Sequence, residues 1–365
     1  MFPSLIIKDI KIEVPIIQGG MGVGVSLYPL ARAVATEGGV GILSSATLDR
    51  LLSKRYRKKI NAYESAYREV TLAKSGGGVT GINIMVALVR DFDDSVRGAI
   101  DAGVDMIISG AGLPISLPSI ARPKHTALIP IVSSVRALTI ICKKWERQGY
   151  LPDAAVLEGP LAGGHLGFRM DHLNLEENLL ENLLLPVKDV ARKFGDFPII
   201  VAGGIYTHDD ICQFLKLGAD GVQMGTRFLG TKESSATSEY KNALLRVKRE
   251  DIIVVDPKKN PPGSPCGLPF RIIRQSPMYQ ETLRRRRPPK CDKGFVLLKD
   301  EKGNFTRCPA KESNEAHFCI CNGLLSSAGY NPGKEKPLYT VGINAHRVDR
   351  IVSVRELMDE LKGKS

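Results

Sequence analysis

The chain has 365 residues, of which 43% are hydrophobic and 25% are charged. This balance is typical of a folded globular protein and excludes a wholly disordered or fibrous one. The formal net charge of +12 raises the alternative of nucleic-acid binding. The basic residues cluster at 54–59 and 284–287, but no helix-turn-helix, zinc-finger or aromatic-interleaved strand pattern lies beside them. We therefore interpret these clusters as solvated basic faces and expect no nucleic-acid partner.

The first residues lack the positive head, apolar run and cleavage site of a signal peptide. No stretch reaches the roughly 18 apolar residues that are needed to span a bilayer. We therefore expect a cytoplasmic protein without a membrane partner. Seven cysteines, an odd number without an export signal, indicate reduced thiols or a metal site rather than a disulfide framework.

Short runs rich in Val and Ile recur through the first two thirds of the chain, and helical segments follow them. They lie at residues 14–18, 40–44, 79–84, 106–109, 129–133, 155–158, 199–202 and 222–225. Apolar strands of this kind are typical of parallel strands covered by helices. Eight such units predict an α/β fold, a (β/α)8 TIM barrel. The alternative is a doubly wound open sheet, which usually has fewer repeats.

The barrel pattern stops after about residue 232, where residues 256–269 become dense in Pro and Gly. We predict three parts: a barrel at 1–232, a Cys-containing extension over the barrel mouth at 233–340, and a C-terminal helical segment at 341–365. Apolar residues at 352, 354, 357, 358 and 361 predict a terminal amphipathic helix that packs on the body.

Reacting groups of such a barrel lie at the C-terminal ends of its strands. The first strand leads into Gln18-Gly-Gly-Met-Gly22, whose glycines leave room for a flat ligand. Asn83 ends the third strand and offers both a donor and an acceptor. Lys124 comes just before the fifth strand, where it is interpreted either as a cation beside a bound phosphate or as a solvated loop lysine.

Two glycine loops follow the seventh and eighth strands. They contain Gly203 and Gly204, and Gly225 and Thr226, respectively. Loops at these two positions often bind phosphate through backbone N–H groups. We therefore predict a phosphorylated ligand, since tight turns without a ligand explain each loop alone but not both together.

The sixth strand leads into Glu158-Gly-Pro-Leu-Ala-Gly-Gly-His165-Leu-Gly. This loop has little side-chain bulk, so a ligand can approach the backbone. His165 suits either acid/base work or the stabilisation of a developing anion. The alternative interpretation is a surface histidine on a flexible turn.

Together these motifs resemble the nitronate monooxygenases, formerly called 2-nitropropane dioxygenases, over about residues 5–275. The resemblance implies an FMN-binding barrel that oxidises alkyl nitronates, which are small anions, with O2 to carbonyl compounds and nitrite. It implies that His165 is catalytic and that Glu158 supports the His165 loop. The residues that it implies for cofactor binding are Gly22, Asn83, Lys124, Glu158, Gly164, Ala202, Gly203, Gly204, Gly225 and Thr226.

The same barrel and loop are similar to those of FMN-dependent enoyl-acyl-carrier-protein reductases. That alternative implies NAD(P)H as co-substrate and an enoyl substrate, and the arginines at 284–287 would dock an acidic carrier protein. A third hypothesis is a protein that only senses flavin or binds RNA. Such a protein would not need His165 in a loop whose glycines leave space for a ligand. The sequence leaves a homodimer open.

Four cysteines of the extension lie close together in the sequence: Cys291, Cys308, Cys319 and Cys321. Their spacing fits neither a zinc ribbon nor a ferredoxin cluster, because no two of them are separated by two intervening residues. We expect buried or redox-reactive thiols and no metal, with a zinc or iron-sulfur site as the alternative.

Overall fold

A computed structural model describes residues 2–120, 123–256, 267–285, 298–299, 305–306, 318–330 and 335–364. Its central feature is a closed barrel of parallel strands in the order β10-β11-β3-β4-β5-β6-β7-β8. The strands are β3 (Ile16–Gln18), β4 (Val40–Ser44), β5 (Val79–Met85), β6 (Met106–Gly110), β7 (Ala127–Val132), β8 (Ala155–Glu158), β10 (Ile199–Ala202) and β11 (Gly221–Met224). All eight predicted strands and the (β/α)8 fold are confirmed, and the closed barrel excludes an open sheet.

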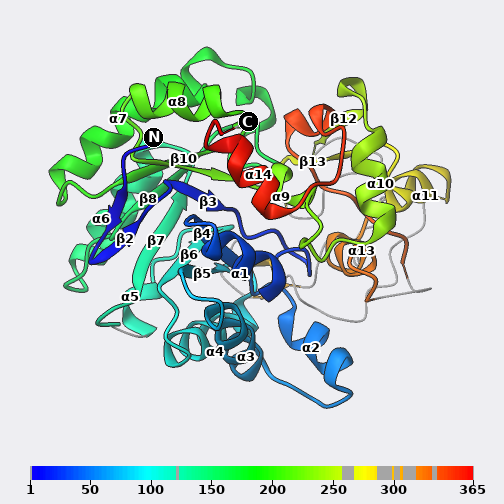
Figure 1. The fold of residues 1–365 in the computed structure, drawn as a ribbon, viewed down its shortest axis with the longest axis horizontal. Coiled ribbons are helices and arrows are strands. Elements are labelled where there is room, and N and C mark those ends of the chain that lie inside the picture. The colour runs from blue at the N-terminus through cyan, green and yellow to red at the C-terminus, as the bar shows by residue number, and fades with distance from the viewer. Residues whose placement is uncertain are drawn as a thin grey trace.

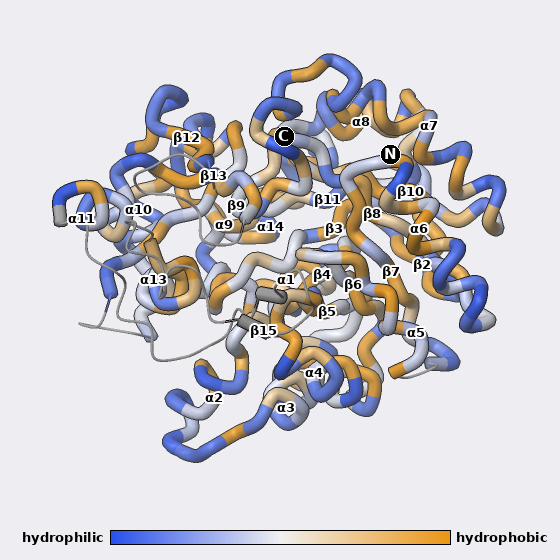
Figure 2. The backbone as a smooth tube through the Cα atoms, turned by 180° about the vertical axis from the view of Figure 1, so that it is seen from behind, coloured by the Kyte–Doolittle hydropathy of each residue, from blue (hydrophilic) through white to orange (hydrophobic). Residues whose placement is uncertain are grey.

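Helices surround the barrel (Figure 1). They are α1 (Tyr28–Thr36), α2 (Leu48–Tyr56), α3 (Ala62–Lys74), α4 (Val89–Asp101), α5 (Leu117–Ile120), α6 (Val135–Glu146), α7 (Leu180–Lys193), α8 (His208–Lys216), α9 (Thr226–Leu229) and α14 (Val354–Leu361). Their apolar faces pack on the outer side of the strands, where Trp145 and Leu184 are fully buried. In Figure 2 the hydrophobic colour follows the barrel strands, and the hydrophilic colour is concentrated around exposed segments such as α2.

The last helix, α14, belongs to the barrel. Val354, Leu357 and Met358 are fully buried in the main core. The ring of His208 on α8 contacts the carbonyl oxygen of Leu361 at 2.9 Å. The helix therefore occupies the position of the eighth barrel helix, inside the segment where the sequence pattern predicts an amphipathic helix.

A hairpin plugs the N-terminal end of the barrel. It consists of β1 (Leu5–Ile7) and β2 (Ile10–Ile12). Leu5, Ile7 and Ile12 are buried in one cluster with inward-facing strand residues such as Ile108 and Val156. With this end filled, ligands have access only from the opposite end, at the C-terminal ends of the strands.

The extension lies between α9 and α14. Its described elements are α10 (Ser238–Arg246), β12 (Ile252–Val255), β13 (Phe270–Ile273), α11 (Pro277–Arg285), the short pair β14 (Leu298–Lys299) and β15 (Phe305–Thr306), α13 (Ile320–Ser327) and the turn Ile343–Arg347. Strand β13 also pairs with β9 (Gly164–His165), which belongs to the loop after β8. This pairing joins the extension to the barrel mouth. None of the described helices is long and apolar enough to cross a membrane.

Candidate active site

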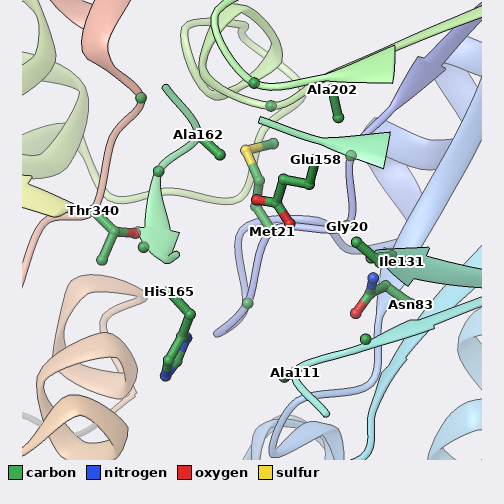
Figure 3. Close-up of a pocket in the computed structure, with 18 of the residues that line it drawn as sticks. Gly20, Met21, Asn83, Ala111, Ile131, Glu158, Ala162, His165, Ala202 and Thr340 are labelled. Carbon is green, nitrogen blue, oxygen red and sulfur yellow. The ribbon is translucent and has the colours of Figure 1, made fainter. Parts of the chain in front are cut away.

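A cavity of about 700 Å³ lies at the C-terminal ends of the barrel strands. Figure 3 shows Asn83, Glu158 and His165 around it, with the side chains of Asn83 and Glu158 directed inward. The structure brings ten of the predicted site residues to the wall of this one cavity. They are Gly22, Asn83, Glu158, Gly164, His165, Ala202, Gly203, Gly204, Gly225 and Thr226.

Lys124 does not reach this cavity, and the prediction that places it beside a ligand is wrong. It is exposed and precedes β7, so it lies at the N-terminal end of the barrel, opposite the cavity. Lys8 of the N-terminal hairpin donates to the neighbouring carbonyl oxygens of Pro123 and Thr126, at 3.5 and 3.3 Å. Among the described residues that line the cavity there is no lysine or arginine.

Two arginines lie near the glycine loops that follow β10 and β11. The guanidinium groups of Arg227 and Arg347 each lie 4.4 Å from the ring centroid of Tyr206, which follows the loop after β10. Arg227 also donates to the hydroxyl of Tyr206 at 3.0 Å and pairs with Glu360. Both arginines lie outside the cavity wall, and the charge of Arg227 is balanced by Glu360.

Glycines allow the loops at the barrel mouth to pack closely against one another, because no side chain separates their backbones. A Cβ atom added to Gly20 would lie 2.4 Å from the Cβ atom of Asn83, and one added to Gly203 would lie 2.9 Å from the carbonyl oxygen of Gly159. Gly203 also has a φ of +96°, which disfavours other residues. A side chain at either position would push these loops apart and change the shape of the cavity.

The cavity wall fits a polar heterocycle that carries a phosphate. The buried Oε1 atom of Gln223 has no hydrogen-bond partner within the described part of the chain. Asn83 presents its amide from β5. Because the first N–H groups of a helix lack partners inside it, the start of α9 at Thr226 can donate to a phosphate oxygen. Together these groups offer hydrogen-bond donors and acceptors to such a ligand.

His165 lies in the short strand β9, opposite Phe270 of β13. The two rings pack edge to face, with centroids 4.7 Å apart and planes at 80°. Burial lowers the pKa of His165 to about 4. The imidazole is therefore neutral at pH 7, with one N–H donor and one acceptor nitrogen. This favours a neutral hydrogen-bond donor over a permanent positive charge.

Glu158 ends β8 inside the cavity, and burial raises the pKa of its carboxyl to about 7. The group is thus divided between its protonated and charged forms near neutral pH. No hydrogen bond joins its side chain to the His165 loop in the part of the chain that the structure describes. Support for that loop comes from elsewhere.

Residues 340–344, here called the strap, contact three of the site loops. The N–H of Gly342 donates to Oγ1 of Thr226 at 2.9 Å, and Nδ2 of Asn344 donates to the carbonyl oxygen of Gly204 at 2.5 Å. The N–H of Ile343 donates to the carbonyl oxygen of Leu161 at 3.2 Å. Sequence reasoning missed the strap because it carries no local motif and lies far from these loops in the chain.

Two of the four candidate cysteines, Cys291 and Cys308, lie outside the described residues. Cys319 and Cys321 both line the cavity, and Sγ of Cys319 accepts from the N–H of Asn322 at 3.5 Å. The described residues contain no group of three or more His, Cys, Asp or Glu side chains arranged for a metal ion. The metal alternative for the full set of four stays untested.

The closed barrel, with paired glycine loops and a histidine at its mouth, suits a flavin-dependent oxidoreductase, and the family match assigns the protein to that class. The family described as nitronate monooxygenase matches residues 4–68 and 76–363, and the chain belongs to this family. The predicted resemblance is confirmed, and it reaches beyond residue 275 through the extension to the last helix.

Several known proteins are similar to the chain. A Mycobacterium tuberculosis protein, (3aS,4S,5R,7aS)-5-hydroxy-7a-methyl-1-oxo-octahydro-1H-indene-4-carboxyl-CoA dehydrogenase, is 29% identical over 82% of this chain and 72% of its own. A probable nitronate monooxygenase of Staphylococcus saprophyticus is 25% identical over 75% of this chain and 81% of its own.

Solved structures show the same fold. FabK from Thermotoga maritima matches with a TM-score of 0.69 and 24% identity, over 97% of this chain and 93% of that one. A nitroalkane oxidase from Streptomyces ansochromogenes matches with a TM-score of 0.64 and 22% identity, over 96% and 95%. At this identity the likeness extends to the architecture alone.

Proposed function

We propose that the protein binds FMN and oxidises alkyl nitronates with O2 to a carbonyl compound and nitrite. The observation that carries this proposal is the position of His165, a neutral imidazole in the wall of the cavity that also holds both phosphate loops. Membership of the nitronate monooxygenase family supports the same reaction. FMN, when bound, takes electrons from the substrate and passes them to O2.

The phosphate of FMN would lie against Gly203, Gly204, Gly225 and Thr226. Gly22, Asn83, Gly164 and Ala202 would lie along the rest of the cofactor. The strap covers the phosphate loops through Thr226 and Gly204. This cover favours a mononucleotide that ends at its phosphate over FAD, whose adenosine must continue past it.

The nitronate is held by neutral donors, since no cationic side chain is found among the described lining residues. His165 donates its N–H to an oxygen of the nitronate, where negative charge must be stabilised. If the substrate is the neutral nitroalkane, the acceptor nitrogen of His165 removes the proton from its α-carbon. Phe270 and Ile320, from the extension, exclude water from this side of the cavity.

The second candidate is FMN-dependent reduction of an enoyl thioester by NAD(P)H. One observation favours it: the outer wall of the cavity is apolar, with Leu268, Phe270, Ile320 and Leu324 supplied by the extension. Such a wall suits an acyl group larger than a simple nitronate. The Mycobacterium relative, by its name, acts on a carboxyl-CoA compound.

To test this, the purified protein is loaded with FMN and mixed without oxygen with a nitronate in one experiment and with NADH in another. Bleaching of the flavin by the nitronate, followed by nitrite release when O2 is admitted, is the expected result. Bleaching by NADH that is reversed by an enoyl thioester, with no reaction of the nitronate, would replace the first function by the second. A colourless protein that FMN does not reconstitute would reject both.

A further inference from the structure

The backbone of His165 is held by the extension and not by the barrel. Strand β9 pairs only with β13 among the described strands, with Phe270 opposite His165 and Arg271 opposite Gly164. The N–H of Leu166 donates to the carbonyl oxygen of Pro269 at 3.0 Å. Since the loop after β8 leaves the barrel before it reaches His165, the extension sets the direction of the imidazole.

Neighbouring residues of a strand point to opposite sides. Phe270 packs against the ring of His165. The side chain of Arg271 points to the other side, toward the part of the β8 loop that precedes His165. Nη1 of Arg271 donates to the carbonyl oxygen of Pro160 at 2.8 Å and also to that of Ala162. Arg271 is only 5% exposed, so these contacts are shielded from water.

Burying the guanidinium of Arg271 costs free energy. It forms no ion pair with a carboxylate in the described part of the chain, and its Nε atom is buried there without a partner. Burial lowers the pKa of the guanidinium to about 10, still well above neutral pH, so the cation persists. A buried cation costs free energy unless polar groups replace its water. The two loop carbonyls are those groups.

Arg271 is one of several contacts that hold the loop. The carbonyl oxygen of Leu161 accepts from the strap, and the side chain of Leu166 is buried in the barrel core. A Cβ atom added to Gly163 would lie 2.6 Å from the carbonyl carbon of Val341, so the strap packs directly against this part of the loop. Gly164 has a φ of +71°, a conformation that glycine adopts without strain. Arg271 adds the contacts to the carbonyls of Pro160 and Ala162.

We propose that Arg271 is a positioning residue: its guanidinium ties the carbonyls of Pro160 and Ala162 and thereby fixes the imidazole of His165 toward the substrate. This inference rests on the proposed function, which gives His165 its role. It means that the extension contributes to the reaction indirectly, by fixing the loop that carries His165. Arg271 itself does not line the cavity.

The test compares Arg271→Met, Arg271→Lys and the control Arg274→Met in the flavin-loaded protein. Arg274 lies just beyond the same strand and is exposed, with one long contact of 3.4 Å to the carbonyl oxygen of Glu250. In Arg271→Met, kcat falls by about a hundredfold, the scale of a small misplacement of a reacting group, and KM changes little. Arg271→Lys keeps the charge and one of the two bonds, and recovers part of the loss.

Two measurements do not depend on the reaction. Amide hydrogen exchange at residues 161–166 is faster in Arg271→Met, because the loop opens more often. NMR titration gives a higher pKa for His165 than in the parent, because the loosened ring meets water. Glu158, Tyr206, Tyr240, Cys319 and Cys321 also line the cavity. Arg274→Met leaves both measurements at parent values.

The inference is overturned if exchange and titration stay at parent values in Arg271→Met. If that variant does not fold, Arg271→Lys decides in the same way, since parent-like exchange and titration would leave Arg271 with a role in folding only. Failure of the proposed function is distinguishable. An inactive parent with fast loop exchange in the Arg271 variants would reject nitronate as substrate and still support the anchor.

Discussion

Phe270 and His165 form an edge-to-face ring pair with centroids 4.7 Å apart, although one belongs to the extension and the other to the loop after β8. Phe270 is 1% exposed and thus closes one side of the imidazole against water. The low pKa of His165 follows from this enclosure. The electrostatic state of the candidate catalytic residue therefore depends on a segment outside the barrel.

Replacing Phe270 by Ala removes this wall. We expect a loss of about 3 to 5 kcal/mol in the free energy of unfolding, the usual cost of deleting a buried phenyl ring. We also expect the pKa of His165 to rise toward 6.5. Urea unfolding and NMR titration measure the two effects. Leu268→Ala is the control, because Leu268 lines the cavity but is 37% exposed. An equal loss in the free energy of unfolding in both variants would contradict the role given to Phe270.

Replacing His165 by Ala should leave FMN bound and lower turnover of a nitronate by roughly a hundredfold or more, the usual scale for an acid/base group. His165→Gln keeps an N–H donor and loses the basic nitrogen. We therefore expect it to retain more activity on the preformed nitronate than on the neutral nitroalkane. Steady-state rates with both substrates measure the difference. Full activity of His165→Ala would leave His165 without a role in catalysis.

The free energy of unfolding should depend on pH through His165 and Glu158, whose pKa values are shifted in opposite directions. The pKa of His165 is lowered to about 4 in the folded protein, so its contribution is lost as the pH falls from 6.5 toward 4. The pKa of Glu158 is raised to about 7, so its contribution is present below 4.5 and is lost as the pH rises through 7.

Glu158→Gln should therefore gain stability relative to the parent between pH 5 and 8, by at most about 3 kcal/mol. His165→Gln should gain relative to the parent between pH 6.5 and 4. Urea unfolding of the flavin-free proteins at several pH values measures both differences. Parallel pH curves for parent and variant would show that the group titrates normally.

The strap should control cofactor affinity. Thr226→Val removes the acceptor of the Gly342 N–H, and Asn344→Ala frees the carbonyl of Gly204. Each lost hydrogen bond costs about 1 kcal/mol, so we expect FMN to bind each variant about fivefold more weakly. Fluorescence titration with FMN measures the affinity. Thr71→Val, which loses a comparable bond on the exposed face of α3, should bind FMN like the parent.

The sequence predicted the barrel because each strand is a local run of apolar residues, as in Ile199–Ala202. Most of the site followed, since strand ends and glycine loops are local features too. Strand β9 could not be predicted in this way: it has two residues, Gly164 and His165, and exists only because β13 pairs with it. Arg271 carries no signal in the sequence that separates it from a solvated arginine.

The error at Lys124 has a different cause. A residue just before a barrel strand lies at the N-terminal end by geometry, so the predicted fifth strand itself placed Lys124 away from the site. The resemblance to the family motif and the strand direction disagree at this position, and the strand direction is correct. The cations that do lie near the phosphate loops, Arg227 and Arg347, are recognisable only once Tyr206 is placed between distant segments.

The eighth barrel helix, α14, follows the whole extension in the chain, yet its side chains complete the core next to α1 and α8. During synthesis on the ribosome, the strands emerge long before the helix that covers them. The apolar outer face of the last unit therefore stays open until the extension has been translated. A chain long enough to contain α14, and thus to complete the barrel core, therefore already contains Phe270 and Arg271 of the extension.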